Sequence, residues 1–503
     1  MNQSLSLIEH LVVVMFENRS FDNLLGWLYS EAPNIPTYNI PHQLSPTFNG
    51  LLPHTYFNIL NHQKVFASHP PTSWPLNPNP YTVPTPDPQE SFKHMNFQIF
   101  GNATSKGQPA SMSGFLEDYS TTLAGLASAG QIMQSFGPLE APVINTLAKQ
   151  FAVCDAWFAS APCQTWPNRG FVHTGSSDGH INNDDYELYD IPTIFNILEE
   201  HHQSWGIFHD TTFWPSLTWG QFLPQLFLKL SHIYPYSIFK QKCAVADTAP
   251  ATDKLPSYSF LEPRFMVEPN QDLSKLNYPN DYHPPHNILR GEAFLADLYQ
   301  SIRLSPYRDK ILLVITFDEH GGCYDHQPPP DNASAPQPGS ISRDGTFDFK
   351  RFGVRVPTIV VSSYISPHTV FRAPSSSAPY DHTSILSTIK SWLLPHLDTA
   401  QFLPSPRISK APTLEPILTL SPKNRNQDWP DIPFFPPDYG DESLDTPLTD
   451  LQKSLVTTLL RKKSTDPLNH QIGVQAMAQS KSLQTYRHVL QLLHPEKDWS
   501  SFK

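Results

Sequence analysis

The sequence predicts an α/β protein with a mostly parallel central sheet flanked by helices, and three apolar runs support this prediction. Residues 11–16, 311–317 and 356–362 are short and rich in Val, Ile and Leu, as expected of strands that are buried on both faces. Apolar residues at helical spacing lie at 288–302, before the second run, and at 385–393, after the third. Strands that alternate with helices are typical of this fold class.

The run at 11–16 is interpreted as the first buried strand. It is too short for the core of a signal peptide, no Lys or Arg precedes Arg19, and the charged Glu17 follows it directly. The run at 311–317 ends in the same way, at Asp318. In open α/β sheets ligands bind outside the carboxyl ends of the strands, so both ends are expected to face a functional site.

Proline spacing indicates how the chain is organised. The sequence holds 52 prolines and 21 glycines, which indicates many rigid, irregular connections. We expect one large domain at residues 1–424, with a Pro-rich insertion at about 27–90 and an aromatic one at 213–239. Residues 425–503 are expected to form a Pro-rich linker and a helical C-terminal extension, with helices around 447–463 and 480–494.

Composition narrows the class of partner. The chain has 503 residues with 34 Lys plus Arg against 46 Asp plus Glu, a formal net charge of −12, which argues against nucleic acid. Four dispersed cysteines form no CxxC pair, which argues against a thiolate zinc cluster or a disulfide scaffold. No apolar stretch approaches the roughly 18 residues of a membrane span. We expect a soluble protein without a conventional signal peptide, cytoplasmic or exported by a dedicated non-classical route, and its oligomeric state is left open.

Two polar clusters follow the first two strands. Glu17 and Asn18 offer a carboxylate and an amide oxygen, which suit a divalent metal; Asn18 as a simple helix cap is the alternative. Asp318, Glu319 and His320 place adjacent carboxylates and an imidazole at one strand end, an arrangement that is costly without a cation. A solvated acidic turn is the alternative there.

Hydroxyl groups between residues 174 and 179 support two incompatible interpretations. Gly175-Ser-Ser-Asp-Gly179 matches the G-x-S-x-G pattern of serine acyl hydrolases, with Ser177 as nucleophile. In the other interpretation a metal lowers the pKa of Ser176 or Thr174, and the resulting alkoxide attacks phosphorus. The dense carboxylates favour metal and phosphate chemistry.

With these motifs in place, the chain resembles the phosphoesterase family that contains bacterial phospholipases C, AcpA-type acid phosphatases and plant non-specific phospholipases C. The resemblance runs in the family's order along most of the chain. It includes HLVVVMFENRSFDNLLGWL (10–28), MSGFLEDYS (112–120), the segment 141–179, NDYHPPHNILRGEAFL (280–295) and ITFDEHGGCYDH (315–326).

The resemblance implies an alkaline-phosphatase-like core and a site of defined composition. It implies metal ligands at Glu17, Asn18, Asp318 and Glu319, and a nucleophile at Ser176 before Thr174. It places His283 near the phosphate for proton transfer, with His320 in reserve. One departure is that Glu90 stands where many members have a histidine. The residues expected at the substrate are Arg19, Glu90, His209, Asp281, Trp214 and Trp219.

The function that follows is a metal-dependent phospholipase C. It would cleave phosphatidylcholine or a related phospholipid at a membrane surface to diacylglycerol and a phosphorylated head group. Zinc is the expected metal, with calcium, manganese and magnesium left open. The aromatic residues of 213–239 are candidates for lipid contact. The alternatives are an acid phosphatase of the same family, a metal-free acyl hydrolase that uses Ser177, and a lipid-binding protein without activity.

Overall fold

The computed structural model describes the chain apart from residues 1–4, 31–34, 43, 71–78, 102–107, 123–125, 184–187, 271–272, 435–442, 466–482, 501 and 503. Its centre is a sheet that, within the described residues, has nine strands in the order β2-β14-β5-β13-β12-β1-β9-β7-β8. These are β1 His10–Phe16, β2 Tyr38–Ile40, β5 Ala152–Cys154, β7 Trp205–His209, β8 Ile233–Pro235, β9 Tyr258–Glu262, β12 Ile311–Phe317, β13 Thr358–Val361 and β14 Thr369–Phe371.

The predicted α/β class and the mostly parallel sheet are confirmed. Strands β1 and β12 pair in parallel along seven residues, and every side chain of both is buried. Only β13 runs against its neighbours β12 and β5. It begins at Thr358, two residues after the start of the predicted run, because Pro357 has no N–H to donate to a ladder.

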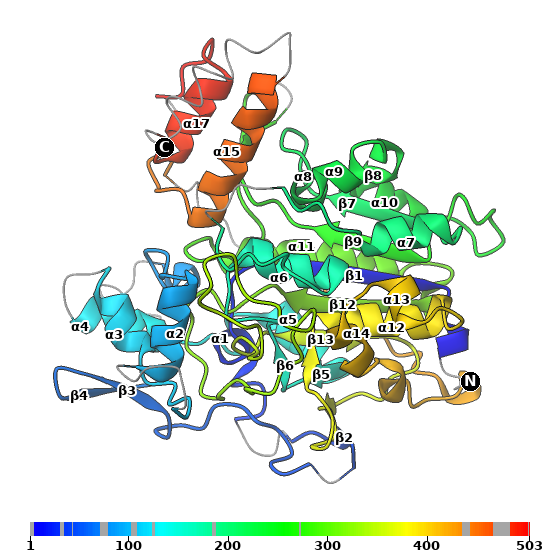
Figure 1. Ribbon diagram of the computed structural model, residues 1–503, viewed down its shortest axis with the longest axis horizontal. Coiled ribbons are helices and arrows are strands. Elements are labelled where there is room, and N and C mark those ends of the chain that lie inside the picture. Colours follow the sequence, from blue (N-terminus) through cyan, green and yellow to red (C-terminus); the bar gives the residue numbers. More distant parts are fainter. Residues whose placement is uncertain are drawn as a thin grey trace.

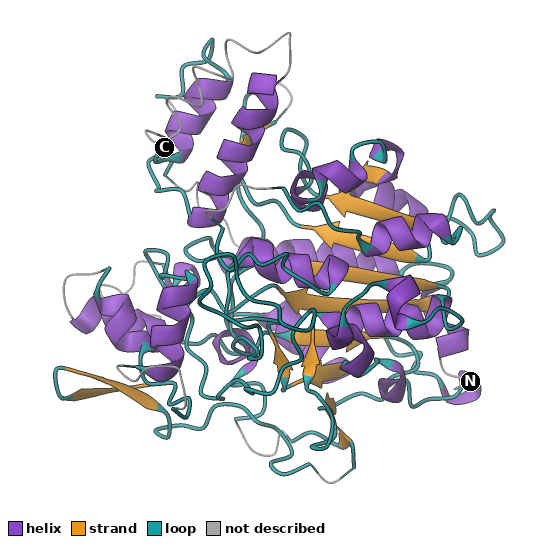
Figure 2. Ribbon diagram, in the orientation of Figure 1, coloured by secondary structure: helices purple, strands orange, loops and turns teal. Residues whose placement is uncertain are grey.

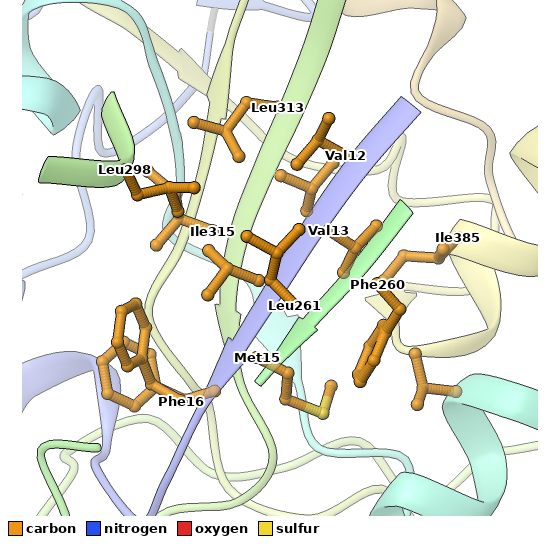
Figure 3. Close-up of a cluster of buried hydrophobic side chains, with 14 of the residues drawn as sticks. Val12, Val13, Met15, Phe16, Phe260, Leu261, Leu298, Leu313, Ile315 and Ile385 are labelled. Atoms are coloured by element: carbon orange, nitrogen blue, oxygen red, sulfur yellow. The ribbon is translucent and has the colours of Figure 1, made fainter. Parts of the chain in front are cut away.

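Helices cover both faces of the sheet (Figure 1). The longest of those predicted are α11 (Ile288–Arg303) and α12 (Thr383–Leu393). Figure 3 shows Leu298 of α11 and Ile385 of α12 approaching the central strands from different sides, where both are fully buried. The other helices that flank the sheet are α1 Phe21–Leu25, α5 Pro142–Gln150, α6 Thr165–Thr174, α7 Ile194–Glu200, α10 Tyr236–Ala244, α13 Thr399–Phe402 and α14 Pro406–Lys410.

Part of the predicted Pro-rich insertion and the chain that follows it form a small unit beside the sheet. A hairpin of β3 (Phe57–Leu60) and β4 (Gln63–Phe66) joins α2 (Phe92–Phe100), α3 (Phe115–Ser120) and α4 (Leu126–Ala129). Its separate apolar cluster includes Trp27, Ile99 and Phe115. The remaining short strands are β6 Trp157–Phe158, β10 Glu268–Pro269, β11 Leu276–Asn277 and β15 Tyr380–Asp381.

The aromatic insertion is mostly core. It forms α8 (Leu217–Gln221), α9 (Leu223–Leu226) and the edge strand β8. Trp214 and Trp219 are only 6% and 5% exposed, and their indole N–H groups donate to the carbonyls of Val267 and Leu226. Their burial leaves them unable to contact lipid in this conformation. Phe227 and Leu228 are exposed instead, at 58% and 86%.

The C-terminal extension contains the two predicted helices, α15 (Asp450–Thr465) and α17 (Tyr486–Leu493). They stand at the side of the molecule toward which the central strands point (Figure 2). Leu451, Val456 and Leu490 are buried in the same apolar cluster as the sheet. Part of the predicted Pro-rich linker, residues 435–442, lies outside the described residues. None of the described helices is both long and apolar enough to span a bilayer.

Candidate active site

The register of β1 and β12 brings the two predicted clusters together. Phe16 pairs with Phe317, so the residues that follow them emerge side by side at the carboxyl edge of the sheet. The backbone N–H of Asn18 donates to Asp318 Oδ1 at 3.0 Å, and the N–H of Asp318 donates to the carbonyl of Phe16 at 3.1 Å. Glu17, Asn18, Asp318 and Glu319 are all fully buried.

The hydroxyl that stands at this edge belongs to Thr165, the first residue of α6. Its Oγ1 lies 3.1 Å from Glu17 Oε2 and 3.4 Å from Asn18 Oδ1. Thr165 is fully buried, and the positive end of the helix dipole lies beside it. The helix N-terminus favours negative charge on Oγ1, and Glu17 Oε2 accepts its hydrogen bond, so Thr165 is a candidate nucleophile.

Arg169 lies one turn along the same helix and holds Glu17. Its Nε donates to Glu17 Oε1 at 2.9 Å, its Nη2 donates to the same oxygen, and Nη2 also donates to the carbonyl of Met15 at 3.0 Å. Both side chains are fully buried. Arg169 therefore orients the carboxylate and leaves Glu17 Oε2 turned toward Thr165.

Two buried carboxylate oxygens at this edge have no hydrogen-bond partner, Asp318 Oδ2 and Glu319 Oε1. The second oxygen of Glu319 accepts from the N–H of Gly321 at 2.7 Å. Gly321 has φ +60, and a Cβ there would lie 2.2 Å from the carbonyl oxygen of Asn18. Only glycine therefore lets this turn pack against residue 18.

Loss of water raises the pKa of Glu17 and Glu319 well above the usual range for glutamate, and the neighbouring carboxylate of Asp318 raises both further. Carboxylates in such a group stay charged when a cation is bound among them. The donor set of carboxylate, amide and hydroxyl oxygens fits a hard divalent metal, and the two unpartnered oxygens are where such an ion would find ligands. These residues therefore fit a metal centre.

A second group lies next to the first. Asp87, Glu90 and His283 each offer a ligand atom, and these atoms lie within 4.8 Å of one another. The side-chain amide of Asn18 donates to Glu90 Oε2, so Glu90 contacts a residue of the first group. Gln164, the residue before Thr165, donates to Glu90 Oε1 at 3.4 Å.

His283 is a neutral imidazole with a defined tautomer. Its Nδ1 lies 2.6 Å from the carbonyl of Pro284 and donates to it, which leaves the lone pair on Nε2. Nε2 is buried and has no partner. Burial lowers the pKa of His283 well below its usual value. A neutral ring with its lone pair on Nε2 accepts a proton or binds a metal, and it cannot donate a proton from that atom.

Asp281 supports the loop of His283. Its Oδ1 accepts from the backbone N–H of His283 at 3.1 Å and from His286 Nδ1 at 2.6 Å, and its carbonyl accepts from the N–H of Glu17 at 3.0 Å. His286 Nε2 lies 3.0 Å from the Tyr486 hydroxyl of the C-terminal extension. Asp281, predicted at the substrate, thus connects the extension to the two acidic groups.

The predicted hydroxyls lie at the other end of α6, about 14 Å away at 1.5 Å per residue. Thr174 Oγ1 donates to the carbonyl of Gly170 at 2.9 Å, and Ser177 Oγ donates to that of His180 at 2.7 Å. Ser176 Oγ accepts from the N–H of Asp178 at 3.0 Å. These side chains stabilise the helix end and the turn after it, and the structure does not bring them to Glu17.

Two further predicted residues, His320 and Arg19, have partners of their own, and a third, His209, lies on another strand. His320 Nε2 lies 2.8 Å from Gln98 Oε1, and burial lowers its pKa to about 3. Arg19 donates to the carbonyls of Tyr282 at 2.6 Å and Val83 at 2.7 Å and so braces two loops. His209 ends β7, which is separated from β1 by β9.

The sequence analysis does not predict Thr165 or Gln164, because its candidate hydroxyls lie in the motif around Ser176. A local signal was present. Pro is favoured in the first turn of a helix, so Trp166-Pro167 marks the start of α6 and puts Thr165 at its N-terminus.

The fold and this edge together define an α/β protein with an acidic centre able to hold a metal beside a buried hydroxyl. A sequence model of the phosphoesterase family matches residues 8–394. The chain belongs to the phosphoesterase family, as the sequence motifs indicated.

Phospholipases C of a plant and of a bacterium are similar to the chain along most of its length. Non-specific phospholipase C4 of Arabidopsis thaliana is 34% identical over 441 residues, covering 84% of this chain and 74% of the relative. Non-specific phospholipase C6 of the same plant is 33% identical, covering 83% and 77%. Phospholipase C B of Mycobacterium tuberculosis is 23% identical, covering 76% and 73%.

Among solved structures, the lipoteichoic acid synthase LtaP from Listeria monocytogenes overlaps with 55% of this chain and 70% of its own, at a TM-score of 0.31 and 14% identity. An alkaline phosphatase superfamily protein from Vibrio parahaemolyticus overlaps with 51% and 60%, at a TM-score of 0.30 and 11% identity. These overlaps are low, and the family assignment depends on the sequence matches.

Proposed function

We propose that the protein is a metal-dependent phospholipase C that hydrolyses a phospholipid to diacylglycerol and a phosphorylated head group. The observation that supports it most is the buried Thr165 hydroxyl, which lies between Glu17 and Asn18 at a helix N-terminus. The names of the relatives, which are phospholipases C of plants and bacteria, favour a phospholipid over other phosphate esters.

In this proposal the metal is held by the oxygen ligands of the first group, and zinc remains the expected ion, with calcium, manganese and magnesium as alternatives. A divalent ion there would supply Lewis acidity, which would lower the pKa of a hydroxyl and offset the charge of a phosphate. The residues that would hold it are Glu17, Asn18, Thr165, Asp318 and Glu319.

The chain's own residues set up the displacement. Thr165 Oγ1 attacks phosphorus, its bond to phosphorus forms as the bond to the glycerol oxygen breaks, and its proton leaves toward Glu17 Oε2. The departing diacylglycerol oxygen takes a proton from water. The α6 dipole stabilises the charge on Oγ1, and Arg169 keeps Glu17 in place. The phosphothreonine is then hydrolysed by water, which returns the hydroxyl.

The alternative of a metal-free acyl hydrolase has little support from the geometry. Ser177 is fully buried, and its hydroxyl is engaged with a backbone carbonyl. An acyl hydrolase needs a serine that is exposed to substrate and paired with a base. The phosphatase alternative within the family shares the proposed site and is separated from phospholipase C only by its product.

Product analysis on phosphatidylcholine vesicles tests the proposal. The purified full chain should release diacylglycerol and phosphocholine when loaded with Zn²⁺, and no fatty acid. Activity should fall to background in a chelator and return when Zn²⁺ is restored. Fatty acid without diacylglycerol, or full activity in the chelator, would contradict the proposed function. Hydrolysis of phosphocholine but not of the lipid would favour the phosphatase.

A further inference from the structure

The group formed by Asp87, Glu90 and His283 raises the question of what it binds. Asp87 and Glu90 come from the loop before α2, and His283 comes from the loop before α11. Their ligand atoms lie within 4.8 Å of one another. Two carboxylates and an imidazole at this spacing have the composition of a transition-metal site.

The charges around the two groups call for more than one divalent cation. Five carboxylates belong to the groups themselves, and Asp281 and Asp450 act electrostatically on them. The basic side chains that act on them are Arg169 at Glu17, and Arg19 and Lys453 at Asp87. Seven carboxylates and three basic groups leave these described residues four negative charges in excess. One divalent ion removes two of them.

The remaining two negative charges would oppose the reaction. A phospholipid brings an anionic phosphate to the same edge, and like charges within a few Å repel strongly in a buried site. A second divalent cation would bring the formal charge of the set to zero before the phosphate arrives.

The imidazole of His283 is an independent sign of a ligand. A metal-binding histidine usually donates its other ring N–H to a carbonyl or carboxylate, which fixes the tautomer. His283 does so through Nδ1 to Pro284, and its Nε2 is fully buried with no hydrogen-bond partner. Asp87 Oδ1 also has no hydrogen-bond partner, and it lies 3.7 Å from His283 Nδ1. A buried lone pair without a donor is costly unless a cation or proton fills the space.

We propose that Asp87, Glu90 and His283 hold a second divalent cation, of the zinc or manganese type, next to the ion proposed for the first group. The inference depends on the proposed function for that first ion. Its role would be to bind an oxygen of the substrate phosphate, as paired ions do in other phosphoryl-transfer sites. It makes His283 a ligand and removes it from the proton-transfer role that the sequence suggested.

Metal stoichiometry tests this proposal without reference to activity. The full chain, stripped with a chelator and reloaded with excess Zn²⁺, should retain two equivalents per chain after desalting, measured by elemental analysis. Glu90→Gln preserves the shape of the side chain and the hydrogen bond from Asn18, and this variant should retain one equivalent of Zn²⁺ per chain. The His283→Asn variant should also retain one equivalent. Asp348→Asn, at an exposed carboxylate that is clear of the site, is the matched control and should retain two.

A second measurement covers a variant that fails to fold or that binds weakly. Circular dichroism establishes that each variant is folded. With Mn²⁺ in place of Zn²⁺, two neighbouring ions should give the spin-coupled electron paramagnetic resonance signal of a pair, and Glu90→Gln should give the six-line signal of an isolated ion.

The possible outcomes separate this inference from the proposed function. One equivalent in the wild type, together with diacylglycerol release, would overturn the second site and leave the phospholipase proposal intact. Two equivalents in Glu90→Gln and His283→Asn would also overturn it. Two equivalents in the wild type and one in the variants would support the second site even if no diacylglycerol were formed.

Discussion

Replacing Thr165 with valine is the sharpest test of the site. Valine keeps the volume and β-branching of threonine, so the fully buried position stays filled. Only the hydroxyl is lost, together with its bonds to Glu17 Oε2 and Asn18 Oδ1. We expect Thr165→Val to remove turnover while the protein stays folded.

The size of the effect follows from what is removed. Loss of a nucleophile lowers kcat by roughly 10³- to 10⁶-fold, or about 4–8 kcal/mol of transition-state stabilisation. The cost to folding is smaller, on the order of 1–3 kcal/mol, because the buried acceptors Glu17 Oε2 and Asn18 Oδ1 lose the hydroxyl that donates to them. Thr165→Ser keeps a hydroxyl at the same atom and should retain turnover within about 10- to 100-fold of the wild type.

The matched control is Ser176→Ala, at the opposite end of α6. It removes an acceptor for the N–H of Asp178, which costs roughly 1 kcal/mol of stability, and it should leave kcat unchanged. The assay is release of diacylglycerol from vesicles by the Zn²⁺-loaded full chain, with thermal unfolding measured in parallel. If Ser176→Ala were inactive and Thr165→Val worked normally, the assignment of the nucleophile from the structure would be refuted.

Two further predictions follow from burial. Leu228 is 86% exposed, and a bilayer contact of one Leu contributes roughly 1.5–3 kcal/mol, so Leu228→Ser should lower hydrolysis of vesicles by about 10-fold relative to a soluble phosphodiester. Trp214→Ser should lower the free energy of unfolding by about 3–5 kcal/mol and leave the ratio of the two activities unchanged. Equal losses on both substrates for Leu228→Ser would contradict the lipid contact. Burial raises the pKa of Glu292 to about 7, against hydrogen bonds from the Tyr282 hydroxyl and two backbone N–H groups. A carboxyl group whose pKa is raised on folding contributes stability that is present below pH 4.5 and lost as the pH rises to 7, on the order of 3 kcal/mol. Glu292→Gln should flatten this part of the unfolding profile, and an unchanged pH dependence would rule out Glu292 as its source.

The central strands could be predicted because burial on both faces leaves a continuous apolar run, as in residues 11–16 and 311–317. The direction of the strands could not be predicted, since β13 is as apolar as the other central strands but runs antiparallel to its neighbour β12. The three-residue strands β2, β8 and β14 carry too few side chains to show a pattern. Tertiary pairing alone defines them.

Glu17 and Asp318 could be assigned to one place because strand ends in a parallel sheet share an edge. Thr165, the proposed nucleophile, could not be found in this way. Its position depends on where α6 starts, whereas the pattern of small residues near Ser176 also suits a helix end. Gly175 there has φ +76 and closes the helix, so the pattern reflects a turn.

The predicted boundary at residue 424 marks a change in composition, but hydrogen bonds join the C-terminal extension to the candidate active site across this boundary. Ser454 of α15 accepts a hydrogen bond from the indole of Trp166, next to Thr165, at 2.8 Å. Gln452 and Tyr486 contact His286, which reaches Asp281 and through it the backbone of His283. Because Gln452, Tyr486 and His286 are all buried, this chain of polar contacts requires the extension to be docked. The extension is therefore part of the structure that positions both acidic groups, and a composition shift along the sequence does not identify a separable unit.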